Sequence, residues 1–152
     1  MEIETILYKK RSRKKKRISK LTGEPIISRQ KAERQLWDAF SLFIRQRDKT
    51  CALEHLGGCS GVLQAGHVIP RTKHAVKYDE GNVFGQCSNH NFLHSQQRTA
   101  YIYINWFIEN RGVAEWRRLN KLVEKDKENK SIGKEEAIRL TKHYQALTNT
   151  QL

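Results

Sequence analysis

Side chains that bind soft metals are concentrated in one stretch of this 152-residue chain, between positions 51 and 91. All three cysteines of the sequence lie in that stretch, and a histidine follows the third cysteine. Thiolates and imidazoles are the preferred ligands of structural Zn²⁺, which binds four of them as a tetrahedron. We therefore expect one structural zinc ion per chain, held by four residues: Cys51, Cys59, Cys87 and His90.

The spacing of these ligands supports one pair more strongly than the other. Cys87 and His90 are at positions i and i+3, so they lie on one face of a starting helix. The first two cysteines are further apart than the roughly two to four residues usual in zinc motifs. His94, one helical turn beyond His90, could complete the site instead, and His55 is a third candidate. Without a metal, the cysteines would be buried as small apolar side chains.

A histidine and two asparagines lie between and just after the ligand pairs. His67 precedes an apolar segment, 68–70, which is expected to form a short strand. Its imidazole titrates near neutral pH and can accept a proton from water. Asn82 could fix the intervening loop so that the His67 ring faces that water. Asn91 and His94, in the following helix, could bind a catalytic Mg²⁺ or Mn²⁺ ion that neutralises a phosphate.

The elements that must position these residues are a hairpin and two helices. The segments 68–70 and 82–85 are read as short strands, and a helix is expected from about Cys87 to Asn110, with Gly112 ending it. An earlier helix over Arg29–Asp48 is predicted by apolar residues at three- and four-residue spacing. The fold class is therefore α+β, with a small zinc-stapled ββα core flanked by α-helices.

We expect three parts along the chain. Residues 1–27 form a basic arm that is disordered or extended, because its dense like charge repels itself. Residues 28–112 form the core with its preceding helix, which Ser28 is expected to cap. Residues 113–152 form a helical extension with two amphipathic segments, at about 113–127 and 134–147.

Gly66-His67, Asn82 and Asn91 together resemble the HNH, or ββα-metal, endonuclease motif in its His-Asn-Asn form. More narrowly, the chain is similar to the NinG/Rap group of phage recombination endonucleases. The segments that carry this likeness are 36–45, 63–71, 78–83 and 85–87. The resemblance covers about residues 29–112, and the C-terminal helices more loosely.

The resemblance implies metal-dependent hydrolysis of DNA phosphodiesters, at branched recombination intermediates. It gives His67 the role of general base, Asn82 that of a loop-positioning residue and Asn91 that of a metal ligand. The chain departs from the family pattern at three places. Gly66 stands where many HNH enzymes carry a metal-binding Asp or His, and His90 replaces the usual last cysteine of the zinc set. The basic arm stands in place of a cysteine-rich N-terminal segment.

The missing side chain at Gly66 leaves the second protein ligand of the catalytic ion open. Asp79, Glu80 and His94 are the candidates in the sequence.

The formal net charge of +13 indicates a polyanionic partner. Eight of the nine residues from 9 to 17 are basic, and the hairpin loop and following helix add further cations. These side chains are expected to contact phosphates, which positions DNA without reading its sequence. The expected DNA-binding residues are Lys9, Lys10, Arg11, Arg13, Lys14, Lys15, Lys16, Arg17, Arg71, Lys73, Lys77 and Arg98.

The expected partner is therefore DNA that is branched or carries a junction between single and double strands. A homodimer would match the approximate two-fold character of branched DNA. No apolar run reaches the roughly 20 residues of a membrane-spanning helix, and the chain start lacks a signal-peptide pattern. We expect a cytoplasmic protein, in the host cytoplasm if it is encoded by a phage. The alternatives are a non-catalytic zinc-containing DNA-binding module and a sequence-specific restriction or homing nuclease.

Overall fold

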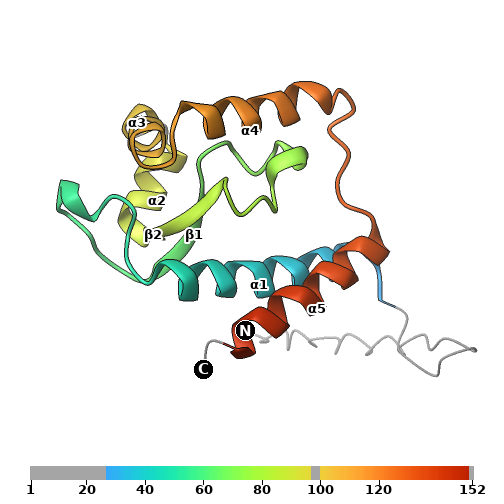
Figure 1. The fold of residues 1–152 in the computed structure, drawn as a ribbon. Coiled ribbons are helices and arrows are strands. Elements are labelled where there is room, and N and C mark those ends of the chain that lie inside the picture. Colours follow the sequence, from blue (N-terminus) through green and yellow to red (C-terminus); the bar gives the residue numbers. More distant parts are fainter. Residues whose placement is uncertain (1–26, 97–99, 151–152) are drawn as a thin grey trace, which may run out of the picture.

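The computed structural model of the chain describes residues 27–96 and 100–150. Over these residues the chain forms five α-helices, two 3₁₀ helices and one two-stranded antiparallel sheet, which confirms the α+β class (Figure 1). The expected DNA-binding residues from Lys9 to Arg17 and Arg98 lie outside the described residues. In chain order the elements are α1 (Arg29–Asp48), η1 (Glu54–Leu56), β1 (Leu63–His67), η2 (His74–Val76), β2 (Val83–Cys87), α2 (Ser88–Ser95), α3 (Ala100–Arg111), α4 (Val113–Lys125) and α5 (Lys134–Thr150).

Helix α1 begins and ends at the predicted residues. The side-chain oxygen of Ser28 accepts a hydrogen bond from the N–H of Lys31 at 3.2 Å, which satisfies one of the free donors at the helix start. At the other end, Lys49 adopts a φ of 62° and its N–H donates a hydrogen bond to the Arg45 carbonyl. The predicted apolar stripe is buried, and its members include Leu36, Phe40, Phe43 and Ile44.

The first strand lies further toward the N-terminus than predicted. β1 ends at His67, whereas the apolar pattern placed a strand at 68–70. Val68 still donates its N–H to the Asn82 carbonyl at 2.9 Å, but Pro70 has no N–H with which to continue the ladder. Val68 and Ile69 are instead buried in a loop, and Pro70 is exposed. The apolar pattern did not predict β1, because the residues after Leu63 in this strand are small or polar.

The sheet lies between two apolar clusters, one with α1 and α5 and the other with α3 and α4. Figure 1 shows these two pairs of helices on opposite sides of the sheet. Alternation along the strands places Ala65 and Val83 toward α1, which in turn packs along α5. Phe84 points to the opposite side, where its ring meets Trp106 and Phe107 of α3 at centroid distances of 5.2 and 5.9 Å. α4 covers this second cluster. Burial on both faces is what holds so short a sheet in place.

The single helix predicted from Cys87 to Asn110 is wrong, because two helices occupy this region (Figure 1). α2 ends at Ser95, and the N–H of Gln96 closes its last turn onto the Phe92 carbonyl. The apolar spacing on either side of this break suits one helix, so the pattern alone did not reveal it.

The C-terminal half is helical as expected. α3 ends directly before Gly112, which has a φ of 84°, a conformation that glycine adopts without a steric penalty. α4 and α5 occupy the two predicted amphipathic segments, and α5 continues to Thr150. Among the described residues, none of the helices is both long and apolar enough to cross a membrane.

Candidate functional site

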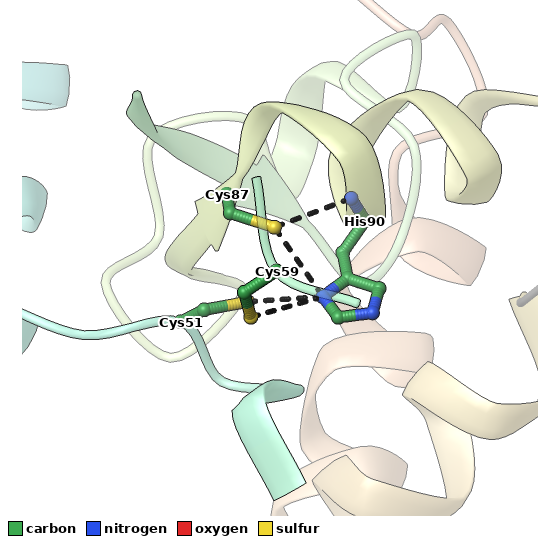
Figure 2. Close-up of side chains that lie close together, drawn as sticks. All are labelled: Cys51, Cys59, Cys87 and His90. Carbon is green, nitrogen blue, oxygen red and sulfur yellow. Dashed lines mark hydrogen bonds between the residues drawn. The ribbon is translucent and has the colours of Figure 1, made fainter. Parts of the chain in front are cut away.

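The three cysteines and His90 converge on one point beside the sheet (Figure 2). Their ligand atoms all lie within 4.8 Å of one another. Nδ1 of His90 lies 3.4 Å from Sγ of Cys51, 3.6 Å from Sγ of Cys59 and 3.4 Å from Sγ of Cys87. In a tetrahedral zinc site with ordinary bond lengths, each N···S edge measures about 3.6 Å. The four residues predicted as ligands therefore form a group that could hold a zinc ion.

Among the three histidines considered as the fourth ligand, His90 is the one that meets the cysteines. Its side chain is buried, whereas His55 is exposed on η1. The ring of His94 packs against Tyr103, with 5.0 Å between ring centroids. His94 is therefore available for another role.

Cys51 is positioned by the chain segment that follows α1, and Cys87 by the end of β2. Cys51 follows α1, and the next residue, Ala52, donates its N–H to the Gly85 carbonyl of β2 at 2.8 Å. Cys87 ends β2 and also caps α2, because its sulfur accepts a hydrogen bond from the N–H of His90. One side chain thus joins the strand, the helix and the metal-ligand group.

Cys59 lies on a glycine-rich loop that brings it to the other ligands. Gly57 and Gly58 have φ values of 70° and 69°, a region that favours glycine. Gly61 has a φ of 74° and also lies so close to Ser88 that a Cβ would come within 2.8 Å of the serine Cβ. The loop therefore approaches the start of α2 closely enough for Cys59 to join Cys87 and His90.

His67, the candidate general base, lies at the end of β1 and stacks on Trp37 of α1. The two rings are 5.4 Å apart between centroids and inclined by 17°. Nε2 of His67 lies 2.9 Å from the main-chain oxygen of Lys77, and no described residue hydrogen-bonds its Nδ1. A carbonyl oxygen only accepts hydrogen bonds, so Nε2 must carry the proton. In the neutral ring, Nδ1 is then the nitrogen with a free lone pair.

Burial keeps the imidazole of His67 neutral. The residue is 8 % exposed, and this desolvation lowers its pKa to about 4, although the hydrogen bond to Lys77 acts in the opposite direction. The nearby positive charge of Arg71 lowers the pKa further. At neutral pH the ring is therefore a proton acceptor.

Asn82, the candidate loop-positioning residue, ties together the loop between the strands. Its side chain is completely buried and makes three hydrogen bonds to the main chain. Oδ1 accepts from the N–H of Ile69 at 2.7 Å, and Nδ2 donates to the carbonyls of Ile69 and Val76 at 2.9 and 3.0 Å. Since Lys77 directly follows Val76, this bracing also holds the carbonyl that orients His67.

Asn91 and His94 both lie on α2, next to β1. Nδ2 of Asn91 donates to Oε1 of Gln64 at 2.7 Å, which leaves Asn91 Oδ1 without a hydrogen bond to any described residue. Burial lowers the pKa of His94, and the nearby backbone of His67 partly offsets this. Nδ1 of His94 is buried and has no hydrogen-bond partner among the described residues. Oδ1 of Asn91 and Nδ1 of His94 are thus both free to bind a cation.

The two acidic candidates for the catalytic ion have other partners. Asp79 forms an ion pair with Arg118 at 2.8 Å and also accepts from the N–H of Gly81. Glu80 accepts a hydrogen bond from the hydroxyl of Tyr144 on α5. Of the three candidates, only His94 has the free, buried ligand atom that a cation would use.

Among the expected phosphate contacts in the hairpin loop, Arg71 and Lys73 are exposed, but Lys77 differs. The ammonium of Lys77 forms an ion pair with Glu33 at 2.7 Å, and both side chains are largely buried. Lys77 is therefore held against α1, and its contribution to the site is its main-chain carbonyl.

Three contributors to the site were not found in the sequence. Trp37 was assigned to the apolar stripe alone, and the carbonyl of Lys77 is a main-chain group with no sequence signature. Gln86 is completely buried beside Gly66. A glutamine within the apolar strand β2 is the signal that could have drawn attention to it, since glutamine is seldom buried.

Comparisons with known proteins do not extend this description. No family model matches the chain, and neither the curated proteins nor the solved structures contain a significant match.

Proposed function

We propose that this chain is a metal-dependent endonuclease of the HNH type, which hydrolyses phosphodiester bonds of DNA. The hydrogen bond between Nε2 of His67 and the carbonyl of Lys77 carries this proposal. It fixes the ring in the tautomer whose Nδ1 can accept a proton from water. An imidazole held in this way can act as a general base, and its lowered pKa makes it a weaker base than a free imidazole.

The order of the surrounding elements supports the proposal. β1, β2 and α2 follow one another along the chain, as a ββα unit requires. Asn82 braces the loop between the strands, and the candidate zinc ligands join the end of β2 to the start of α2. A zinc ion held there would contribute about 10–16 kcal/mol of apparent folding free energy to this unit, far more than one buried side chain contributes.

In the proposed reaction, Nδ1 of His67 takes a proton from water while the water oxygen forms a bond to phosphorus. The bond between phosphorus and the leaving oxygen breaks at the same centre. General-base action of this kind contributes a factor of roughly 10²–10⁴ in rate. The carbonyl of Lys77 stabilises the imidazolium that results, because it accepts a hydrogen bond from the protonated Nε2.

The reaction also calls for a divalent cation, Mg²⁺ or Mn²⁺. Asn91 and His94 would hold it through the free atoms described above. When bound, the ion neutralises the phosphate and stabilises the leaving oxygen. Asn91 offers an oxygen ligand, which both ions accept, whereas the imidazole of His94 suits Mn²⁺ better.

The proposed substrate is branched DNA, and this part of the proposal comes from the resemblance to phage recombination endonucleases. The net charge of +13 supports a polyanionic substrate. Exposed Arg71 and Lys73 follow His67 in the chain, so they are suited to bind phosphates flanking the one that is cut.

A non-catalytic DNA-binding module is the second candidate, and one observation favours it. His67 is only 8 % exposed and stacks on Trp37, so a phosphate would reach its ring from a limited range of directions. In such a module the same histidine would be a structural part of the interface between α1 and the sheet.

Cleavage by a His67→Gln variant tests the proposal. Glutamine can still donate a hydrogen bond to the Lys77 carbonyl, but it cannot accept a proton. The matched control is His143→Gln, since His143 is exposed on α5. Zinc-loaded wild type and the control should cut duplex, forked or four-way DNA in the presence of Mg²⁺ or Mn²⁺, and His67→Gln should lose at least 100-fold in rate.

DNA affinity and zinc content should be the same in all three proteins. If wild type binds these substrates but cuts none of them with either ion, the binding module is correct. If His67→Gln cuts as fast as wild type, His67 is not the base.

A further inference from the structure

Gln86 is a buried polar side chain whose hydrogen-bonding atoms are both unused. It is completely inaccessible to solvent, and neither Oε1 nor Nε2 has a hydrogen-bond partner among the described residues. Burial of an amide without partners is unfavourable, so such groups are rare in folded proteins. An amide in this state can bind a water molecule or an ion that enters the site.

The side chain of Gln86 fills the space that a side chain at residue 66 would occupy. A Cβ built on Gly66 would lie 2.7 Å from Cδ of Gln86 and would collide with its Oε1. The strand register explains the approach. Gln86 of β2 pairs with Gln64 of β1, and Gly66 follows Gln64 by two residues on β1. All three positions therefore face the same side of the sheet. Gly66 thus leaves the space that the Gln86 amide occupies, and any side chain at residue 66 would displace this amide.

The same side of the sheet carries the other free ligand atoms. Gln64, directly opposite Gln86, holds Nδ2 of Asn91 and so leaves Asn91 Oδ1 available. The hydroxyl of Tyr103 donates to the Gly66 carbonyl at 3.2 Å, and the ring of Tyr103 contacts His94. Nδ1 of His94 is buried without a partner, like the amide of Gln86. Gln86 thus lies beside Gly66, Asn91 is linked to the same strand through Gln64, and His94 is linked to Gly66 through Tyr103.

We propose that Oε1 of Gln86 is a ligand of the catalytic divalent cation and replaces the side chain that Gly66 lacks. This inference rests on the proposed function, because it names a ligand for the ion of that site. An amide oxygen is a hard donor of the kind that Mg²⁺ and Mn²⁺ bind. The set Gln86, Asn91 and His94 is uncharged when His94 is neutral, so the ion receives no compensating charge from these three residues. The phosphate of the substrate would supply this compensating negative charge.

Mn²⁺ binding to zinc-loaded, full-length protein tests the inference, with free Mn²⁺ measured by its electron paramagnetic resonance signal. Gln86→Met keeps the length of the side chain but removes the oxygen, whereas Gln86→Glu keeps an oxygen and adds a charge. We expect Gln86→Glu to bind one Mn²⁺ at least ten-fold more tightly than wild type. Gln86→Met should bind it at least ten-fold more weakly than wild type, or not measurably.

The matched controls are Gln46→Met and Gln46→Glu. Oε1 of Gln46 is also buried without a partner among the described residues, but Gln46 lies on α1, which packs against the face of the sheet opposite to Gln86. These variants should bind Mn²⁺ as wild type does. Zinc content and thermal unfolding are measured for every variant. If Gln86→Met does not fold, the comparison of Gln86→Glu with wild type decides.

A swap of the two positions gives an independent test. Gly66→Asp alone should destabilise the protein, because its side chain would collide with Gln86. In the double variant Gly66→Asp with Gln86→Ala the space is free, and a carboxylate at residue 66 should restore Mn²⁺ binding to at least the wild-type affinity. The single variant Gln86→Ala, which has neither ligand, should not bind Mn²⁺.

Equal Mn²⁺ affinity of wild type, Gln86→Met and Gln86→Glu, or no binding by any of them, would overturn the inference. It would fail while the proposed function stands if Gln86→Met cut DNA and bound Mn²⁺ as wild type does. The function would fail while the inference stands if Mn²⁺ binding followed the pattern above but wild type did not cut DNA.

Discussion

Nε2 of His67 and the main-chain oxygen of Lys77 lie 2.9 Å apart, although the two residues are ten positions apart in the chain. The loop between them is braced by Asn82, and Trp37 covers one face of the ring. These contacts hold the ring in one tautomer and one orientation. They also bury it, and this burial lowers the pKa of His67 to about 4.

The lowered pKa of His67 predicts a loss of stability in mild acid. Between pH 6.5 and about 4 the unfolded chain binds a proton at His67 that the folded chain does not bind, so stability rises with pH in this window. The stabilisation is complete above pH 6.5 and is lost as the pH falls toward 4. The full effect is about 3 kcal/mol.

Urea unfolding at pH 7 and pH 4.5 measures this effect. Wild type should lose more free energy of unfolding between the two values than His67→Gln, because glutamine does not titrate. Any loss of zinc in acid is shared by both proteins and cancels in the comparison. The control His143→Gln should behave as wild type. A His67→Gln variant with the same pH dependence as wild type would show that His67 titrates normally.

Substitution of Asn82 is expected to lower the free energy of unfolding strongly. Asn82→Ala removes three hydrogen bonds and leaves the N–H and the carbonyl of Ile69 without partners inside the loop, whereas the Val76 carbonyl still accepts from the N–H of Asp79. Groups without partners cost about 1–3 kcal/mol each when buried, so we expect a loss of about 2 kcal/mol or more in urea unfolding. The control Asn110→Ala removes a hydrogen bond at the surface and should cost less than about 1 kcal/mol. Equal effects of the two substitutions would contradict the bracing role of Asn82.

Residues whose type limits their chemistry could be predicted from the sequence. The cysteines and His90 were recognised as one group because few other roles bring three thiols and an imidazole together. Helix α1 was predicted with correct bounds, since its apolar spacing, its serine cap and its length all indicate the same element. Gly112 likewise marked the end of α3 correctly.

Features that depend on contacts across the fold could not be predicted in this way. β1 was missed because Gln64, Ala65 and Gly66 show no apolar alternation. The apolar Val68 placed the predicted strand after the end of β1. The break after Ser95 separates two segments that both have helical spacing. The relation between Gly66 and Gln86 arises from strand register, which the sequence does not fix for so short a sheet.

The candidate zinc group predicts that the fold depends on metal. Removal of the ion with a chelator should lower the melting temperature and reduce helical circular dichroism, because the metal would join the Cys59 loop to the start of α2. Cys59→Ser should bind zinc at least ten-fold more weakly, and Ser60→Ala, the neighbouring control, should bind it normally. One zinc per chain is the expected content by metal analysis. A melting temperature that does not change with the chelator would exclude a structural zinc ion.

The ion pair of Lys77 predicts which cations of the hairpin loop contribute to DNA binding. The slope of log affinity against log salt falls by about 0.9 for each phosphate contact that is lost on duplex DNA. The double variant Arg71→Ala with Lys73→Ala should therefore reduce the slope by nearly 2, because both side chains are exposed. Lys77→Ala should leave the slope unchanged, since its ammonium already pairs with Glu33 at 2.7 Å. Fluorescence anisotropy over a range of salt concentrations measures both slopes. A fall in slope for Lys77→Ala, or none for the double variant, would show that DNA approaches the loop from a different side.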